Sequence, residues 1–217
     1  MKIGKFLLAA VAVVVVTGCA TSRSVVPVDV PVDRDSGAQN GSIFIESVVD
    51  NRMFENAPRN PSTPSLGFEG ASAASDEMKA RAIGRKRNAY GKALGDVILP
   101  ENQTVEELIR KYATAAFNDA GWQVVENASA DQIVAIQIDE LWAWFKPGFW
   151  AITLNSNVST TLTFVQNEVK IPVSVHVEDT RQMATESAWK EIVEMALSEY
   201  RKKVSTSVPK PRELEGR

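Results

Sequence analysis

Apolar and polar residues alternate strictly enough after residue 152 to limit the folds open to this chain. Over residues 152–164 alternate positions are mainly apolar, and the positions between them are mainly Thr, Asn and Ser. The alternation returns over residues 169–177, after a turn at Gln166-Asn167. Because successive side chains of a strand point to opposite faces, each segment has one face for a core and one for water. The pattern predicts two consecutive antiparallel strands, and Pro172 places the second at a sheet edge or at a bulge.

Two other segments carry the signals of amphipathic helices. Residues 104–107 form a capping box, in which the side chains of Thr104 and Glu107 satisfy backbone N–H groups at a helix start. Apolar residues then recur at helical spacing up to Ala120, and Gly121 suits the cap that follows a helix. A second helix is expected over about residues 185–204, with one apolar face made of Trp189, Ile192, Val193, Ala196, Leu197, Tyr200 and Val204.

Further strands complete the predicted fold. They are expected at residues 42–49, 122–126 and 132–145, and in the first of them Ile43 and Ile45 lie on the face opposite to Val48. The order of elements predicts an α+β domain whose mixed, mostly antiparallel sheet has four to five strands and two helices on one face.

The segments rich in proline and glycine define the limits of this domain. We assign the domain to residues 42–204 and interpret residues 57–75, which proline and glycine interrupt repeatedly, as a long internal loop. Residues 205–217 contain Pro209, Pro211 and mixed charges, and they are expected to form a disordered tail.

The N-terminus has the parts of a secretory signal. Lys2 and Lys5 precede an apolar run over residues 6–16 that is too short to span a bilayer comfortably, and small residues then lead to Cys19. The sequence Val-Thr-Gly-Cys resembles the lipobox of bacterial lipoproteins. It predicts that residues 1–18 are a cleaved signal peptide and that Cys19 carries covalent diacylglycerol and N-acyl lipid (palmitate). The alternative is an ordinary signal peptide with a chance cysteine near the cut.

The residues after the cysteine have little amphipathic pattern. Residues 19–41 contain Pro27, Pro31 and many small polar residues, so we interpret them as the lipidated N-terminus and a tether. As an alternative, the Val-Pro-Val-Asp-Val-Pro-Val stretch that starts at Val26 can dock as an edge strand, because proline is tolerated there.

Charge and cysteine content exclude several functions. Cleavage removes Lys2 and Lys5, which lowers the basic residues from 24 to 22 against 27 acidic ones and leaves a net charge of −5. A chain with this charge is not expected to bind nucleic acid. Cys19 is the only cysteine, so a lipidated chain keeps no thiol for a disulfide, a nucleophile or a zinc site. Apart from the covalent lipid, no cofactor or metal is expected.

The residues capable of acid–base chemistry are poorly arranged for catalysis. His176 is the only histidine, and we interpret it as a solvated strand residue. A triad of Ser174, His176 and Asp179 fails because Asp179 points to the other face of an ideal strand. Asp139 and Glu140 are adjacent and point to opposite faces unless a bulge intervenes. Phosphate-loop, metal and dinucleotide motifs are absent from the sequence, so we expect no enzymatic activity.

One candidate for binding is a run of basic residues. It can meet the phosphates of lipid head groups or an acidic patch on a partner, because arginine pairs with both. The alternative is a solvated, partly helical face. The run comprises Lys79, Arg81, Arg85, Lys86, Arg87 and Lys92.

The second candidate is an aromatic hairpin around Pro147 and Gly148. Trp142 and Trp144 share one face of their strand, and the turn is expected to bring Phe149 and Trp150 close to them. Lys146 adds a charge that suits a head group or a carboxylate, and Gly148 is expected to take the positive φ of a type II turn. Such a cluster suits a recognition site, since aromatic residues dominate binding hot spots. The alternative is a satellite core under the long loop.

Several phrases of the sequence resemble one family. The lipobox, the phrase from Ile83 to Val97, the helix end at Ala120-Gly121-Trp122 and the strand start at Ala130-Asp131 are similar to the YajG-like family of bacterial outer-membrane lipoproteins. The resemblance implies an outer-membrane location and no established enzymatic activity. In related lipoproteins an aspartate after the lipidated cysteine retains the protein at the inner membrane, so Ala20 favours the outer membrane.

These observations predict a non-enzymatic outer-membrane lipoprotein that faces the periplasm and binds an envelope component, either a protein or a glycolipid. The alternative is a structural accessory subunit, whose aromatic hairpin is buried in an envelope complex or in a homo-oligomer.

Overall fold

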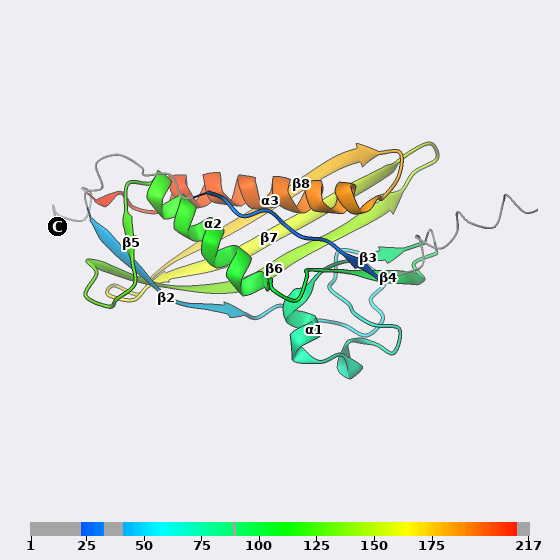
Figure 1. Cartoon of the computed structure of the whole chain (residues 1–217), viewed down its shortest axis with the longest axis horizontal. Helices are drawn as coiled ribbons and strands as arrows, with labels where there is room; N and C mark the ends of the chain where they lie inside the picture. Colours follow the sequence, from blue (N-terminus) through cyan, green and yellow to red (C-terminus); the bar gives the residue numbers. More distant parts are fainter. Residues whose placement is uncertain (1–22, 33–40, 89, 212–217) are drawn as a thin grey trace, which may run out of the picture.

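The computed structural model describes residues 23–32, 41–88 and 90–211, which form an α+β domain with a mixed sheet of eight strands (Figure 1). The signal peptide expected at residues 1–18 and the lipidated Cys19 lie outside the described residues. The helices are α1 (Asp76–Arg81), α2 (Val105–Asp119) and α3 (Glu186–Ser207), with a 3-10 turn at Ala71–Ala73. The strands are β1 (Ser24–Val25), β2 (Ser42–Asp50), β3 (Ala82–Arg87), β4 (Ala93–Ile98), β5 (Gln123–Val125), β6 (Gln132–Pro147), β7 (Ile152–Phe164) and β8 (Val169–Arg181).

Strand β6 organises the sheet from its centre. Along one edge it pairs antiparallel with β7, which pairs antiparallel with β8. Along the other edge its first half pairs parallel with β2, and its second half meets β3, where Gly84 lies opposite Ala143. β5 continues the sheet beyond β2, while β4 and then β1 continue it beyond β3. The long β6–β7–β8 part confirms the strands that the alternating pattern predicts.

The α+β class is confirmed, but the sheet of four to five mostly antiparallel strands is wrong in size and in direction. Among the described residues, four of the seven strand pairs are parallel. β3 and β4 were not predicted because residues 82–98 are rich in basic residues and glycine and lack apolar alternation. β1 has two residues, which is too short for any periodic signal.

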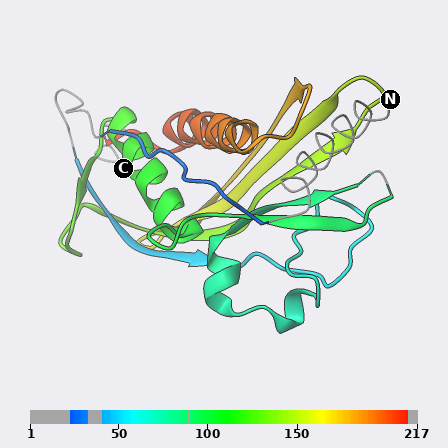
Figure 2. The same ribbon diagram turned by 45° about the vertical axis from the view of Figure 1, so that its right-hand side comes forward.

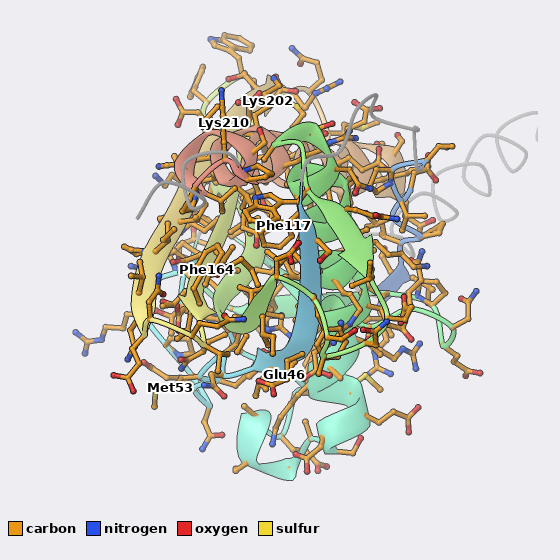
Figure 3. The ribbon with its side chains drawn as sticks, turned by 90° about the vertical axis from the view of Figure 1, so that its left-hand side faces the viewer. Glu46, Met53, Phe117, Phe164, Lys202 and Lys210 are labelled. Atoms are coloured by element: carbon orange, nitrogen blue, oxygen red, sulfur yellow. The ribbon has the colours of Figure 1, made fainter. Side chains whose placement is uncertain are left out.

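Helices α2 and α3 cover one face of the sheet and enclose the main core. The capping box at Thr104 and Glu107 is present, and α2 starts directly after it. Phe117 of α2 and Phe164 of β7 point into the space between the helices and the sheet (Figure 3). Lys202 and Lys210 lie at the periphery in the same view. The apolar stripes on the two helices therefore face the sheet, as their spacing predicts.

Two bulges change which residues face this core. One lies between Ile45 and Ser47 of β2, the other between Ile138 and Glu140 of β6. A bulge inserts an extra residue and so reverses the alternation beyond it. Val48 is therefore buried on the core side, together with Ile45, and its expected position on the opposite face was wrong.

A second, smaller core lies on the opposite face of the sheet. Residues 51–75, which include the long loop expected at 57–75, cover that face together with α1 (Figure 1). Arg52 fixes the start of this segment, because its buried guanidinium donates hydrogen bonds to the carbonyl oxygens of Ala82 (2.6 Å) and Leu141 (3.0 Å). The buried members of the second core are Leu66, Ala71, Ala82, Ile98, Trp142 and Trp144.

The N-terminal segment is attached to the domain along residues 23–32. Val26 donates to the carbonyl of Ile98 (2.8 Å), and the Gln103 side chain exchanges two hydrogen bonds with the backbone of Val28 (2.8 and 3.1 Å). Val26 and Val28 are buried in the main core, beside the helices. The tether expected over residues 19–41 is therefore wrong for residues 23–32, and the alternative of docking is the better description, although the paired strand is Ser24–Val25.

The C-terminal residues also pack more than expected. Helix α3 continues to Ser207, and Val208 and Pro211 are buried. The indole N–H of Trp122 donates to the carbonyl oxygen of Pro209 at 2.9 Å. The disordered tail expected over residues 205–217 is thus wrong for residues 205–211, because apolar contacts and this hydrogen bond hold them, while residues 212–217 lie outside the described part.

Replacing Gly84 by alanine should lower the free energy of unfolding by about 1–3 kcal/mol, the usual cost of overpacking. A Cβ at this position would lie 2.6 Å from the carbonyl oxygen of Ala143, so β3 and β6 would have to separate. Urea unfolding followed by circular dichroism measures the loss. Unchanged stability in Gly84→Ala would contradict the close approach of these two strands.

Candidate binding surface at the hairpin tip

The basic residues of β3 are buried and bind the long loop. Arg85 donates to the carbonyl oxygen of Gly67, and it forms an ion pair with Asp96 at 3.5 Å. Arg87 donates to the carbonyl oxygen of Pro58 (3.0 Å) and to the hydroxyl of Ser65 (2.7 Å). These arginines therefore join the sheet to residues 57–75 and are not displayed to a partner.

The electrostatics of these arginines follow from their burial. Burial lowers the pKa of Arg85 below its usual value, and the Asp96 carboxylate opposes that shift. Burial also lowers the pKa of Arg87, and the positive charge of Arg85 adds to the effect. Asp96, which is itself buried, also accepts a hydrogen bond from the backbone N–H of Gly67 (3.2 Å). The negative charge of Asp96 thus offsets the positive charge of Arg85, which has a second buried cation, Arg87, close to it.

Lys86 points to the other side of β3 from its two neighbours. Its ammonium group donates to the hydroxyl of Ser24 at 2.8 Å, which ties β3 to the N-terminal segment. Lys86 is buried like Arg85 and Arg87, so the expected solvated or phosphate-binding face at these three residues is wrong. Long side chains such as these find internal backbone partners that composition does not reveal.

The structure separates the four aromatic residues of the hairpin into two pairs. Trp142 and Trp144 lie in the second core, where the indole N–H of Trp142 donates to the carbonyl oxygen of Pro61 at 3.2 Å. Phe149 and Trp150 lie in the turn between β6 and β7 and are exposed to solvent. The expectation that all four gather is wrong, because β6 continues to Pro147 and carries the turn beyond the second core. The alternative of a satellite core under the long loop describes Trp142 and Trp144.

The exposed part of the hairpin is a compact tip, which we define as Lys146, Phe149 and Trp150. The two rings meet edge to face, with centroids 4.8 Å apart and planes at 87°. Gly148 does not take the expected positive φ; a Cβ there would instead lie 2.5 Å from the carbonyl oxygen of Ala151, to which its N–H donates at 2.9 Å. A tight turn therefore presents two aromatic rings and one ammonium group to the surroundings.

His176 belongs to a short polar chain on the exposed strand face. Its Nδ1 lies 2.7 Å from the Asn157 side-chain oxygen, and the Asn157 amide donates to Glu140 at 3.2 Å. Its ring also covers Trp144, with centroids 5.9 Å apart. These contacts give His176 the role of a surface residue that shields the second core.

The bulge in β6 changes the position of the two adjacent carboxylates. Asp139 accepts from the Thr161 hydroxyl (3.2 Å), and Glu140 accepts from the Asn157 amide. Both line one open hollow beside Pro64. The hollow is formed by a strand face and a loop, and Asp139 is exposed to solvent in it.

Neither a metal-binding set nor a membrane-spanning helix is present among the described residues. No three His, Cys, Asp or Glu side chains in this part of the chain gather as a metal-binding set would. In the same residues, no helix combines the length and apolar character needed to cross a bilayer.

Two exposed residues in other turns were not predicted as site residues. Tyr90 lies in the turn between β3 and β4, and Met183 lies between β8 and α3. The sequence signal for an exposed Tyr90 was its position between Asn88 and Gly91, two residues typical of turns. In the structure the Asn88 side-chain oxygen accepts from the backbone N–H groups of Tyr90 and Lys92, and Gly91 has a positive φ.

Comparison with known proteins gives only distant likenesses. No protein-family model matches the chain, and no curated protein matches it significantly. The solved structures that resemble it include a DUF330 protein from Xanthomonas campestris, with 12% identity over 88% of this chain and 98% of the other and a TM-score of 0.48. A neuraminyllactose-binding hemagglutinin homologue from Helicobacter pylori has 9% identity, coverage of 88% and 96%, and a TM-score of 0.39.

A third resemblance is partial. A lipoprotein from Neisseria meningitidis has 12% identity over 48% of this chain and 90% of the other, with a TM-score of 0.28. At these scores the likenesses carry no inference about function. The resemblance to the YajG-like family stays a prediction.

Proposed function

We propose that this chain is a lipoprotein of the outer membrane, anchored through diacylglycerol and N-acyl lipid on Cys19 and facing the periplasm. In this proposal the domain has no enzymatic activity and binds an envelope component, which is a protein or a glycolipid. The lipobox at residues 16–19, the alanine at position 20 and the resemblance to the YajG-like family support the location.

The observation that carries the binding role is the exposed aromatic pair at the hairpin tip. Phe149 and Trp150 meet edge to face in the turn between β6 and β7, both are exposed, and Lys146 closely precedes them in the sequence. Exposed aromatic side chains with a neighbouring charge are typical of binding hot spots, because they bury a large area with few rotatable bonds. The basic residues Arg85, Lys86 and Arg87 have no part in this role, since they are buried.

The second candidate function is that of a structural accessory subunit in an envelope complex or a homo-oligomer. The observation that favours it is strand β8, which pairs with β7 alone among the described strands and has 13 residues. The side chain of Lys203 covers one carbonyl of this edge, at Ser174 (2.6 Å), and Pro172 offers no N–H, so another strand pairs only along the remaining part of β8. The size of the soluble domain in solution discriminates the two: a stable monomer favours the binding module.

Replacing Cys19 by serine should abolish acylation and leave a soluble or uncleaved protein, because serine lacks the thiol that receives diacylglycerol. Labelling of cells with radioactive fatty acid measures acylation, and fractionation of the wild type should place the protein with the outer membrane. Normal labelling of Cys19→Ser would refute the lipoprotein proposal. Co-migration of the acylated wild type with inner-membrane markers would refute the location alone.

A further inference from the structure

Three turns lie toward one end of the sheet. β3 runs parallel to β6, with Gly84 opposite Ala143, so the turns that follow these two strands lie at the same end. β8 ends opposite Ile152, the first residue of β7, so the connection from β8 to α3 lies there as well. Figure 1 shows the β3–β4 turn, the β6–β7 turn and the start of α3 on the right-hand side of the molecule, and Figure 2 shows the first two turns on one side as well.

These turns carry most of the exposed aromatic surface of the described residues. The exposed fractions of the aromatic residues are 95% for Tyr90, 88% for Phe149 and 84% for Trp150. The remaining exposed aromatic residue, Phe68, lies in the long loop. Met183, an apolar residue that is not aromatic, is 69% exposed in the third turn. Lysine accompanies them at positions 92 and 146. We call Tyr90, Lys92, Lys146, Phe149, Trp150 and Met183 the aromatic end.

The two ends of the sheet differ in chemistry. In the sequence, residues 88–92, 146–151 and 182–185 contain no Asp or Glu. At the opposite end, residues 126–131 and 165–168 contain Glu126, Asp131 and Glu168, and they contain no aromatic residue and no lysine. Tryptophan and tyrosine are enriched at the boundary between lipid and water, and lysine is attracted to anionic head groups. Among these turns, those of the aromatic end combine aromatic residues with lysine, which is the composition of a surface in contact with lipid.

The path of the N-terminal segment links this end to the lipidation site. β1 is parallel to β4, with Ser24 opposite Val97, so Arg23 lies on the side of Ser24 that faces the β3–β4 turn. An ion pair with Asp96 at 3.5 Å holds Arg23 there. Cys19 is four residues earlier, and four residues span at most about 14 Å. The same number of residues separates Asp96 from Lys92 in that turn, so the anchor is within reach of the aromatic end.

We propose that the aromatic end contacts the lipid bilayer that holds the acyl chains of Cys19. In this arrangement the head-group region receives the apolar side chains of the aromatic end, which are Tyr90, Phe149, Trp150 and Met183. The two lysines of this end, Lys92 and Lys146, face anionic phosphates. The opposite end, with its acidic turns, points away from the membrane. This inference rests on the proposed lipidation of Cys19. It names the bilayer surface as the envelope component that the hairpin tip contacts.

The tryptophans provide a direct test. Of the five tryptophans, Trp122, Trp142, Trp144 and Trp189 are buried, and Trp150 is the exposed one. The full acylated protein is reconstituted into vesicles of phosphatidylethanolamine and phosphatidylglycerol, with or without bromine on the acyl chains. We expect brominated vesicles to quench part of the emission, and we expect Trp150→Phe to lose that quenchable part.

A matched control moves the reporter to the other end. In the Trp150→Phe background, Val169→Trp places an exposed tryptophan at the start of β8, beside the acidic turn, and its emission should not be quenched. Flotation of the vesicles reports anchoring separately. Protein that floats while Trp150 stays unquenched by the brominated lipids and accessible to iodide in the water would overturn the bilayer contact and leave the anchor intact. If the wild-type protein isolated from cells carries no acyl chain and does not float, the proposed function itself is overturned, and the bilayer contact with it.

Discussion

Replacing Trp142 by alanine should lower the free energy of unfolding by about 3–5 kcal/mol, the usual cost of truncating a buried aromatic residue. The side chain is fully buried in the second core, and Phe54 packs against it edge to face at 6.0 Å. Its indole N–H also donates to Pro61 in the long loop, so the truncation removes a tie to that loop as well as apolar contact. Equilibrium unfolding in urea measures the change.

The matched control lies in the same hairpin. Trp150→Ala removes a residue that is 84% exposed, so it should change the free energy of unfolding by no more than about 0.5 kcal/mol. A comparable loss in the two variants would mean that the tip packs on something in the folded domain. A loss below about 1 kcal/mol for Trp142→Ala, well short of the usual core cost, would mean that the second core is not formed as described. The pair thus separates the role of this hairpin in folding from its role in recognition.

Replacing Asp96 by asparagine should destabilise the domain by about 3–5 kcal/mol, the usual effect of removing one partner of a buried ion pair. The carboxylate lies between the guanidinium groups of Arg85 and Arg23, each at 3.5 Å, and it accepts the N–H of Gly67. Without its charge, Arg85 stays buried with no carboxylate, beside Arg87. Because the long loop is bonded to these arginines, we expect it to become sensitive to proteolysis in Asp96→Asn.

Three further variants, Asp76→Asn, Arg85→Met and the double variant Arg85→Met with Asp96→Asn, make this prediction specific. Asp76→Asn removes a carboxylate that pairs with Lys79 at the surface, where ion pairs contribute about 0–1 kcal/mol, so it should have little effect. Adding Arg85→Met to Asp96→Asn removes the uncompensated charge and should recover part of the lost stability. If the double variant is as unstable as the sum of the two single variants, Arg85 and Asp96 are not coupled and the electrostatic account fails.

Patterns within one segment predicted the elements whose structure depends on that segment. The alternation over residues 152–177 predicted β7 and β8, and the capping box at Thr104 predicted the start of α2. Each of these signals concerns residues close in sequence. Their physical causes also act over a few residues: side chains alternate in direction along a strand, and a capping side chain bonds the backbone at a helix start. The signal peptide and the lipidation of Cys19 are predictions of the same local kind.

The aromatic hairpin shows where local patterns stop. The sequence placed Trp142 and Trp144 on one face of a strand, and the structure agrees, but it did not reveal whether a partner or the chain itself covers that face. The long loop covers it, through contacts between residues about 80 positions apart, such as Trp142 and Pro61. Only Phe149 and Trp150, beyond the end of β6, stay exposed.

The basic residues of β3 show even more clearly that local sequence patterns do not predict which side chains are buried. Composition predicted that Arg85, Lys86 and Arg87 are solvated, because charged residues are rarely buried without partners. Their partners are Asp96, Ser24 and the carbonyl groups of the long loop, and only the tertiary structure brings these groups together. The bulges in β2 and β6 were not predicted either, because a one-residue shift in strand pairing depends on the partner strand and cannot be read from the amino-acid composition. The sequence by itself therefore predicted helices α2 and α3 and the alternating strands, and it is the basis for expecting an anchor at Cys19. It did not predict α1, and tertiary contacts decided which charged and aromatic residues are buried and which form the exposed tip.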